Sequence, residues 1–131
     1  MKKEGITVTL SPAKSEEYFY NALCNAVGSG YMSGYSLELK ANDQDYAESR
    51  KKLNNPCLED VWMQMLRDGK TLTMIDHESG EDDKTISLSD VHERVSKTPL
   101  RHLSDMMSGN NDAETADAII QTVFYEDIIF G

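Results

Sequence analysis

Two short segments carry side chains of the types that bind metal ions. Residues 76–78 are Asp-His-Glu and residues 90–93 are Asp-Val-His-Glu, on either side of a predicted β-hairpin. Imidazole nitrogens and carboxylate oxygens are ligands of Zn²⁺ and of harder divalent ions. Neighbouring side chains of a strand point to opposite faces, so His77 cannot converge with both of its acidic neighbours. We therefore predict solvated charge here, with a small metal-dependent hydrolase using His77 and His92 as the alternative.

A nucleophilic cysteine is the second chemical possibility. Cys57 is expected in the first turn of a helix, where the helix dipole lowers the pKa of a thiol. His77 or His92 would then act as its base. A free cysteine is more often a small apolar filler, and His102 is expected to be an ordinary residue of a later helix. The favoured prediction is a protein with no catalytic and no metal-binding residues.

The glycine-rich segment 28–34, Gly-Ser-Gly-Tyr-Met-Ser-Gly, does not fit a dinucleotide-binding loop. Its third glycine is one position late, and the segment follows a predicted helix instead of joining a strand to a helix. The chain also lacks the GxxxxGK[ST] loop that holds nucleoside triphosphates. We predict a tight turn at this segment and no cofactor.

The negative charge is concentrated in the last part of the chain. The net charge is −10: residues 76–131 hold four Lys or Arg against thirteen Asp or Glu, whereas residues 1–75 hold nine against ten. Such a charge repels nucleic acid and anionic membranes and attracts basic protein surfaces. The one basic cluster, residues 50–52, complements the end of a helix dipole. We predict a protein partner, best matched by a basic one, and no direct contact with nucleic acid or membrane.

We predict that this partner binds acidic residues of the C-terminal region and the apolar residues beside them. The protein would then be a non-catalytic binding module, accessory or inhibitory to a basic or nucleic-acid-binding partner, and DNA mimicry is one form of such inhibition. The predicted surface comprises Glu81, Asp82, Asp83, Asp112, Glu114, Asp117, Glu126, Asp127, Ile129 and Phe130.

The apolar end of the chain leaves another alternative open. Phe124, Tyr125 and residues 128–130, Ile-Ile-Phe, place five large apolar or aromatic side chains within seven positions. They either pack as the last element of the fold, which we favour, or cover a partner or a second copy of the chain. A homodimeric structural protein sealed through this segment is therefore an alternative to the binding module.

The elements that position these residues follow from periodicity. Alternating apolar residues predict strands at 5–10, 35–40, 71–76 and 84–88. The last two should form an antiparallel hairpin, with inward-facing side chains at Leu72, Met74, Ile86 and Leu88. Apolar residues at helical spacing predict helices over the stretches 15–27, 42–53, 56–67, 89–95, 98–107 and 112–124.

Capping residues predict where three of these helices begin. Ser15 is expected to cap the first helix, Asn55 the third, with Pro56 in its first turn, and Ser89 the fourth. The resulting order predicts an α+β fold in a single domain, 1–131: a small, mainly antiparallel sheet with a central hairpin (about 71–76/84–88), covered by several amphipathic helices.

Cysteine usage and the N-terminal sequence predict the compartment. Cys24 and Cys57 lack CxxC spacing, so we expect two free thiols, with a disulfide between them as the alternative. The first residues do not form a signal peptide, and no apolar run approaches the roughly 20 residues that span a bilayer. We expect a cytoplasmic protein.

Two segments are similar to known sequences. Residues 55–61, Asn-Pro-Cys-Leu-Glu-Asp-Val, and residues 86–95, Ile-Ser-Leu-Ser-Asp-Val-His-Glu-Arg-Val, resemble small, acidic, uncharacterised proteins of phages and mobile elements. That group has no defined fold or activity. The resemblance implies an accessory role and assigns no functional residue.

Overall fold

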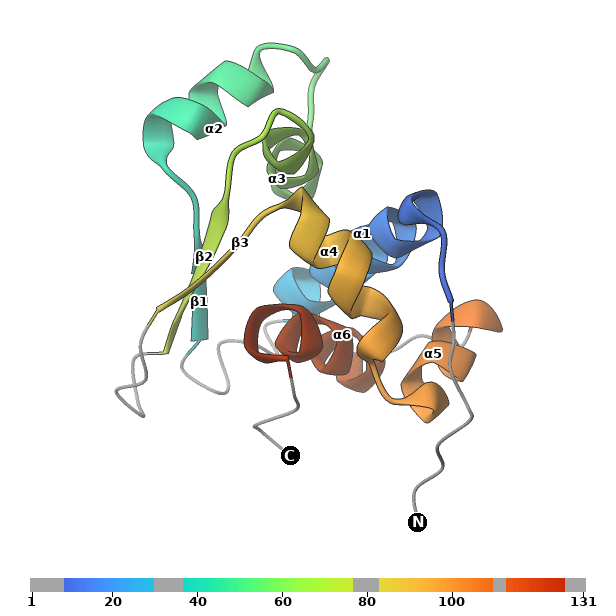
Figure 1. Cartoon of the computed structure of the whole chain (residues 1–131). Helices are drawn as coiled ribbons and strands as arrows, with labels where there is room; N and C mark the ends of the chain where they lie inside the picture. The colour runs from blue at the N-terminus through green and yellow to red at the C-terminus, as the bar shows by residue number, and fades with distance from the viewer. Residues whose placement is uncertain (1–8, 30–36, 77–82, 110–112, 127–131) are drawn as a thin grey trace.

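The computed structural model describes residues 9–29, 37–76, 83–109 and 113–126 (Figure 1). These residues form an α+β fold, as the sequence predicts. The elements, in chain order, are α1 (Pro12–Ser29), β1 (Leu37–Lys40), α2 (Asp43–Arg50), α3 (Leu58–Arg67), β2 (Leu72–Asp76), β3 (Lys84–Ile86), α4 (Leu88–Arg94), η2 (Val95–Lys97), α5 (Leu100–Met107) and α6 (Ala113–Tyr125). The predicted strand at 5–10 and the last segment, 128–131, lie wholly or mostly outside the described residues.

The three strands form one antiparallel sheet in the order β1-β2-β3. The predicted hairpin is confirmed, with Leu72 opposite Ile86, and the side chains of Leu72, Met74 and Ile86 are buried. On the other face the hydroxyl groups of Thr73 and Thr85 lie 3.0 Å apart in a hydrogen bond. One face of the sheet therefore packs on the core while the opposite face carries polar side chains.

Helix α6 is the centre of the helical layer, where it contacts α1, α4, α5 and β3 (Figure 1). Its apolar spacing predicts one buried face, but every side chain from residue 115 to residue 124 is buried. Two polar side chains on its other face form hydrogen bonds within the helix. Gln121 donates a 2.6 Å hydrogen bond to Asp117, and Thr122 donates one of 2.7 Å to the carbonyl of Ala118. The predicted apolar face of α6 is therefore buried, and its opposite face is buried as well because neighbours surround the helix.

The beginning of α1 differs from the prediction. Ser11, not Ser15, caps the helix: the amide of Lys14 donates a 3.1 Å hydrogen bond to the Ser11 hydroxyl. Pro12 occupies the first helical position, where its fixed φ suits the helix and its missing N–H costs nothing. Ser15 lies inside the helix and is buried.

Two other helices begin at residues other than the predicted caps. Cys57 caps α3, and its amide donates a 3.2 Å hydrogen bond to Asp60. Asn55 instead takes a left-handed conformation before the helix, with φ of 53°, which asparagine tolerates. Ser87 rather than Ser89 caps α4, so Leu88 begins this helix and does not extend the strand.

The pair Asp68-Gly69 in the sequence predicts a left-handed glycine at the end of α3, and the structure confirms it. Gly69 has φ of +86°, and the amide of Lys70 donates a 2.8 Å hydrogen bond to the carbonyl of Met65. This is the Schellman arrangement, in which a residue without a Cβ atom relieves backbone strain.

We expect Gly69→Ala to lower the free energy of unfolding by about 1 kcal/mol. No atom lies within 4 Å of an added Cβ, so the whole cost comes from the backbone conformation. Gly69→Asn should cost less, because asparagine enters the left-handed region more readily than alanine. Urea denaturation checks both variants, and an alanine variant as stable as wild type would contradict the expectation.

Candidate functional site

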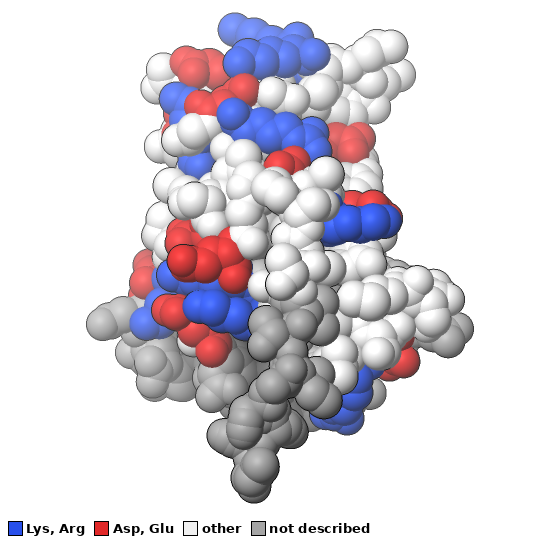
Figure 2. Space-filling model, turned by 45° about the vertical axis from the view of Figure 1, so that its right-hand side comes forward, with Lys and Arg blue, Asp and Glu red and all other residues white. Residues whose placement is uncertain are grey.

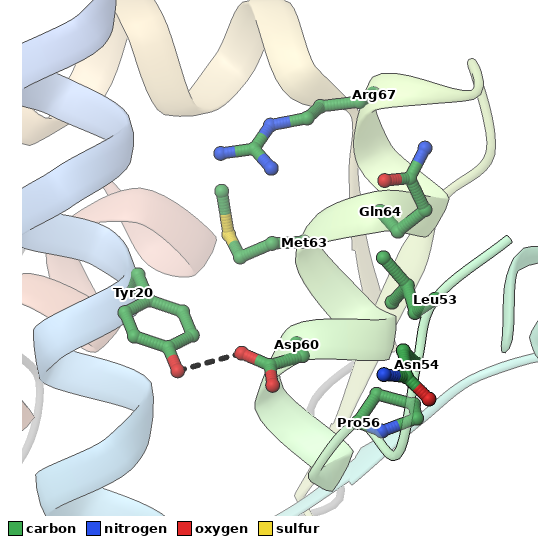
Figure 3. Close-up of a pocket in the computed structure, with 8 residues that line it drawn as sticks. All are labelled: Tyr20, Leu53, Asn54, Pro56, Asp60, Met63, Gln64 and Arg67. Atoms are coloured by element: carbon green, nitrogen blue, oxygen red, sulfur yellow. Dashed lines mark hydrogen bonds between the residues drawn. The ribbon is translucent and has the colours of Figure 1, made fainter.

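A pocket of about 430 Å³ lies between α1 and α3 (Figure 3). Four of its lining residues, spaced three or four positions apart, come from one face of α3, as helical periodicity requires. Tyr20 enters from α1, and the rest come from the segment between α2 and α3. The lining residues are Tyr20, Leu53, Asn54, Pro56, Asp60, Met63, Gln64 and Arg67.

Asp60 is the acidic group of this pocket. One of its carboxylate oxygens accepts a 2.7 Å hydrogen bond from the Tyr20 hydroxyl (Figure 3). The other accepts one from the backbone amide of Cys57. These hydrogen bonds hold the pKa of Asp60 below its ordinary value, and the bond from Tyr20 has the largest effect. The carboxylate is therefore ionised at neutral pH, and its remaining lone pairs can accept from a ligand.

Arg67 is the basic group at the other end of the pocket. Figure 3 shows its guanidinium group above Met63, on the side of α3 that faces α1. Its Nε atom donates a 3.0 Å hydrogen bond to Glu16 on α1. Glu16 therefore compensates the charge of Arg67, while within the described part of the chain no lysine or arginine pairs with Asp60.

Glu16 also forms a hydrogen bond with the side chain of His92 on α4, with 2.7 Å between His92 Nε2 and Glu16 Oε2. Partial burial raises the pKa of Glu16, but the hydrogen bonds from His92 and Arg67 outweigh it and hold this pKa below its ordinary value. One carboxylate thus ties α1 to both α3 and α4.

We expect Glu16→Gln to lower the free energy of unfolding by about 1 kcal/mol at pH 7, because two charge-assisted hydrogen bonds are lost. Glu17→Gln is the matched control, since Glu17 is half exposed and, among the described residues, its ion pair is with Lys14. The cost of this variant should stay within about 0.5 kcal/mol.

The loss at Glu16 should also depend on pH. A carboxylate with a depressed folded-state pKa stabilises the protein above its unfolded pKa, and that stabilisation disappears as the pH falls through the folded pKa. The difference between wild type and Glu16→Gln should therefore hold above the ordinary glutamate pKa of about 4.3 and shrink below it. Urea titrations across this range measure the difference, and a constant difference at every pH would contradict the assignment.

The thiol of Cys57 does not have the lowered pKa that its place at a helix start suggested. Its hydrogen bond with Glu59 is the largest influence, and it raises the pKa of Cys57. The thiol is exposed and not bonded to Cys24. The Glu59 carboxylate opposes the helix dipole here, so the pKa of Cys57 gives no support to the alternative of a nucleophilic thiolate.

The histidines do not come together in the described residues. His92 pairs with Glu16, and His102 is buried on α5, while His77 lies outside the described residues. Over residues 9–29, 37–76, 83–109 and 113–126, no group of three or more His, Cys, Asp or Glu side chains could hold a metal ion.

The predicted acidic surface is only partly described. Asp83 and Glu126 are exposed, and Glu126 lies 3.6 Å from Arg94. Asp117 is buried, with 5% of its surface exposed, so its place in a partner-binding surface is a wrong prediction; it lies on the second buried face of α6. The other members lie outside the described residues or have undescribed side chains: Glu81, Asp82, Asp112, Glu114, Asp127, Ile129 and Phe130.

The described charged residues do not form a continuous acidic surface on the face drawn in Figure 2. Lys and Arg side chains (blue) are interspersed there with Asp and Glu side chains (red). Basic groups lie at the top, and a cluster of both signs lies at the lower left. The described large apolar side chains that remain exposed are Leu58, Leu100 and Met107. The helical spacing of the sequence predicts Leu58 on the core face of its helix, but the structure leaves this side chain exposed next to Cys57.

Comparison with known proteins gives no relative for this chain. A scan against protein-family models, a search of curated proteins and a search of solved structures each found no match. The resemblance to proteins of phages and mobile elements therefore stays a prediction. None of the helices in the described segments has the length and apolar character needed to cross a membrane.

Proposed function

We propose that this protein acts without catalysis by binding another protein, and that the pocket between α1 and α3 accepts a lysine or arginine side chain of that partner. The observation that carries the proposal is Asp60, an ionised carboxylate held by Tyr20 and by the Cys57 amide with no basic partner in the described chain. A cation is the chemical group that completes such an arrangement.

The walls of the pocket suit the rest of a basic side chain. Met63, Leu53 and Pro56 supply apolar surface beside the carboxylate. Lysine and arginine bury their methylene stems on such surfaces while the charged head reaches a polar group. Gln64 adds an amide that can donate to, or accept from, the partner backbone.

Long-range electrostatics favour the same class of partner. The net charge of −10 attracts basic surfaces and speeds their encounter with the protein. The proposal therefore agrees with the prediction from the sequence that the partner is basic. The contact site differs from the predicted one, because the pocket is built from residues 20–67 and not from the acidic C-terminal region.

A pair of short blocked peptides tests the proposal. One has a single central lysine, and the other has norleucine at that position, which keeps the methylene stem and removes the charge. We expect the lysine peptide to bind with a Kd on the order of 1 mM, as befits one anchored side chain, and the norleucine peptide to bind at least about tenfold more weakly. Equal binding of the two peptides, or no binding of the lysine peptide, would refute a cation-selective pocket.

A further inference from the structure

The two cysteines, 33 positions apart in the chain, lie on the two helices that pack together around Tyr20. The Sγ atom of Cys57 lies 4.0 Å from the Tyr20 oxygen. Cys24 lies one turn along α1 from Tyr20, on the same face of the helix. Burial, followed by smaller contributions that include the charge of Cys57, raises the pKa of Cys24. Helices α1 and α3, which carry them, are in direct contact.

We propose that Cys24 and Cys57 are a paired redox site, which closes reversibly into a disulfide between α1 and α3 by exchange with a small-molecule disulfide of the glutathione class. The geometry that points to this pair is the position of Tyr20 between them: its hydroxyl contacts Cys57 on α3, and Cys24 lies one helical turn from it on α1, which packs on α3. This inference does not depend on what the neighbouring pocket binds.

The exposure of the two thiols sets the order of the steps. Cys57 is exposed and Cys24 is only partly so, so the Cys57 thiolate attacks the small disulfide first. This step forms a mixed disulfide at Cys57 and releases one glutathione thiolate. The Cys24 thiolate then attacks the Cys57 sulfur, which forms the internal bond and releases the second glutathione thiolate. Two protein thiols are oxidised and one glutathione disulfide is reduced, and the two protons lost by the protein thiols are taken up, through solvent, by the two glutathione thiolates.

The environment of the thiols makes the exchange slow at neutral pH. Burial raises the pKa of Cys24, and the hydrogen bond with Glu59 raises that of Cys57. Because only the thiolate reacts, the rate should rise by up to about tenfold for each pH unit below those pKa values. Glu59→Gln should accelerate the first step, since it removes the carboxylate that disfavours the Cys57 thiolate.

The test uses the full-length, reduced protein, incubated with oxidised glutathione and analysed by intact mass spectrometry after acid quenching. We expect the wild type to lose the mass of two hydrogens and to keep no glutathione. Cys24→Ser should stop at the mixed disulfide on Cys57, and Cys57→Ser should react much more slowly. A wild-type protein that keeps its glutathione adduct, or that becomes a dimer linked through Cys57, overturns the proposal.

A comparison with unfolded protein separates the site from ordinary chain flexibility. The ratio of internal disulfide to dithiol, in a fixed glutathione buffer, measures the effective concentration of one thiol at the other. We expect this ratio to be at least about tenfold higher in the folded protein than in urea, because the fold holds both thiols at Tyr20. A ratio that is equal or lower in the folded protein would overturn the proposal even if the bond forms.

Discussion

Replacing Phe19 by alanine is expected to lower the free energy of unfolding by about 3–5 kcal/mol. Phe19 lies on α1 with none of its surface exposed, and its ring centroid lies 6.5 Å from that of Phe124 on α6. Truncation would leave a cavity where α1 meets the central helix. The loss is a large part of the roughly 5–15 kcal/mol that stabilises an ordinary domain.

Urea denaturation followed by Trp62 fluorescence would measure this effect, because Trp62 is the only tryptophan and is buried. Phe19→Leu is the matched control: it keeps most of the apolar volume and should cost less than the alanine variant. A Phe19→Ala protein within about 1 kcal/mol of wild type would show that α1 and α6 do not form the centre of the core.

Asp60→Asn is expected to weaken binding of the lysine peptide by about tenfold or more, equivalent to at least about 1.4 kcal/mol. Asparagine keeps an oxygen that can accept from Tyr20 or from the Cys57 amide, but it loses the charge that attracts the ammonium group. The affinity for the norleucine peptide should change little, since that peptide makes no ion pair.

Glu59→Gln is the matched control for Asp60→Asn. Both residues lie in the first turn of α3, so either change removes one negative charge from the same end of the helix. Only Asp60 lines the pocket, and Glu59→Gln should therefore alter the affinity by no more than about twofold. Equal losses in the two variants would indicate general charge attraction without a specific site. Thermal unfolding of both proteins would verify that the fold is retained.

The periodicity of the sequence predicts the fold class, because strand and helix patterns depend on local spacing. The hairpin of β2 and β3 and the glycine end of α3 are confirmed for this reason. The starts of α1, α3 and α4 were missed because several neighbouring residues can cap a helix, and tertiary packing selects among them. Ser11 before Pro12 did carry the right signal, a capping side chain followed by proline in the first turn.

The candidate site could not be predicted in the same way. Tyr20 and Asp60 are 40 residues apart, and only the packing of α1 on α3 brings them into contact. The spacing of Asp60, Met63, Gln64 and Arg67 does place them on one helical face, but nothing in it identifies the partner of that face. The prediction that Asp117 is exposed was wrong for a different reason. A charged residue is expected at the surface, but α6 is surrounded by other elements and Asp117 is buried.

The most direct test of the proposed binding site is to map the lysine peptide on the protein by NMR, from amide shifts in a titration of the ¹⁵N-labelled chain. Shifts centred on Tyr20, Asp60 and Met63 are predicted, and they should disappear in Asp60→Asn. Shifts centred on Asp83 and Glu126, with none in α3, would contradict the account and place the contact on the acidic C-terminal region instead.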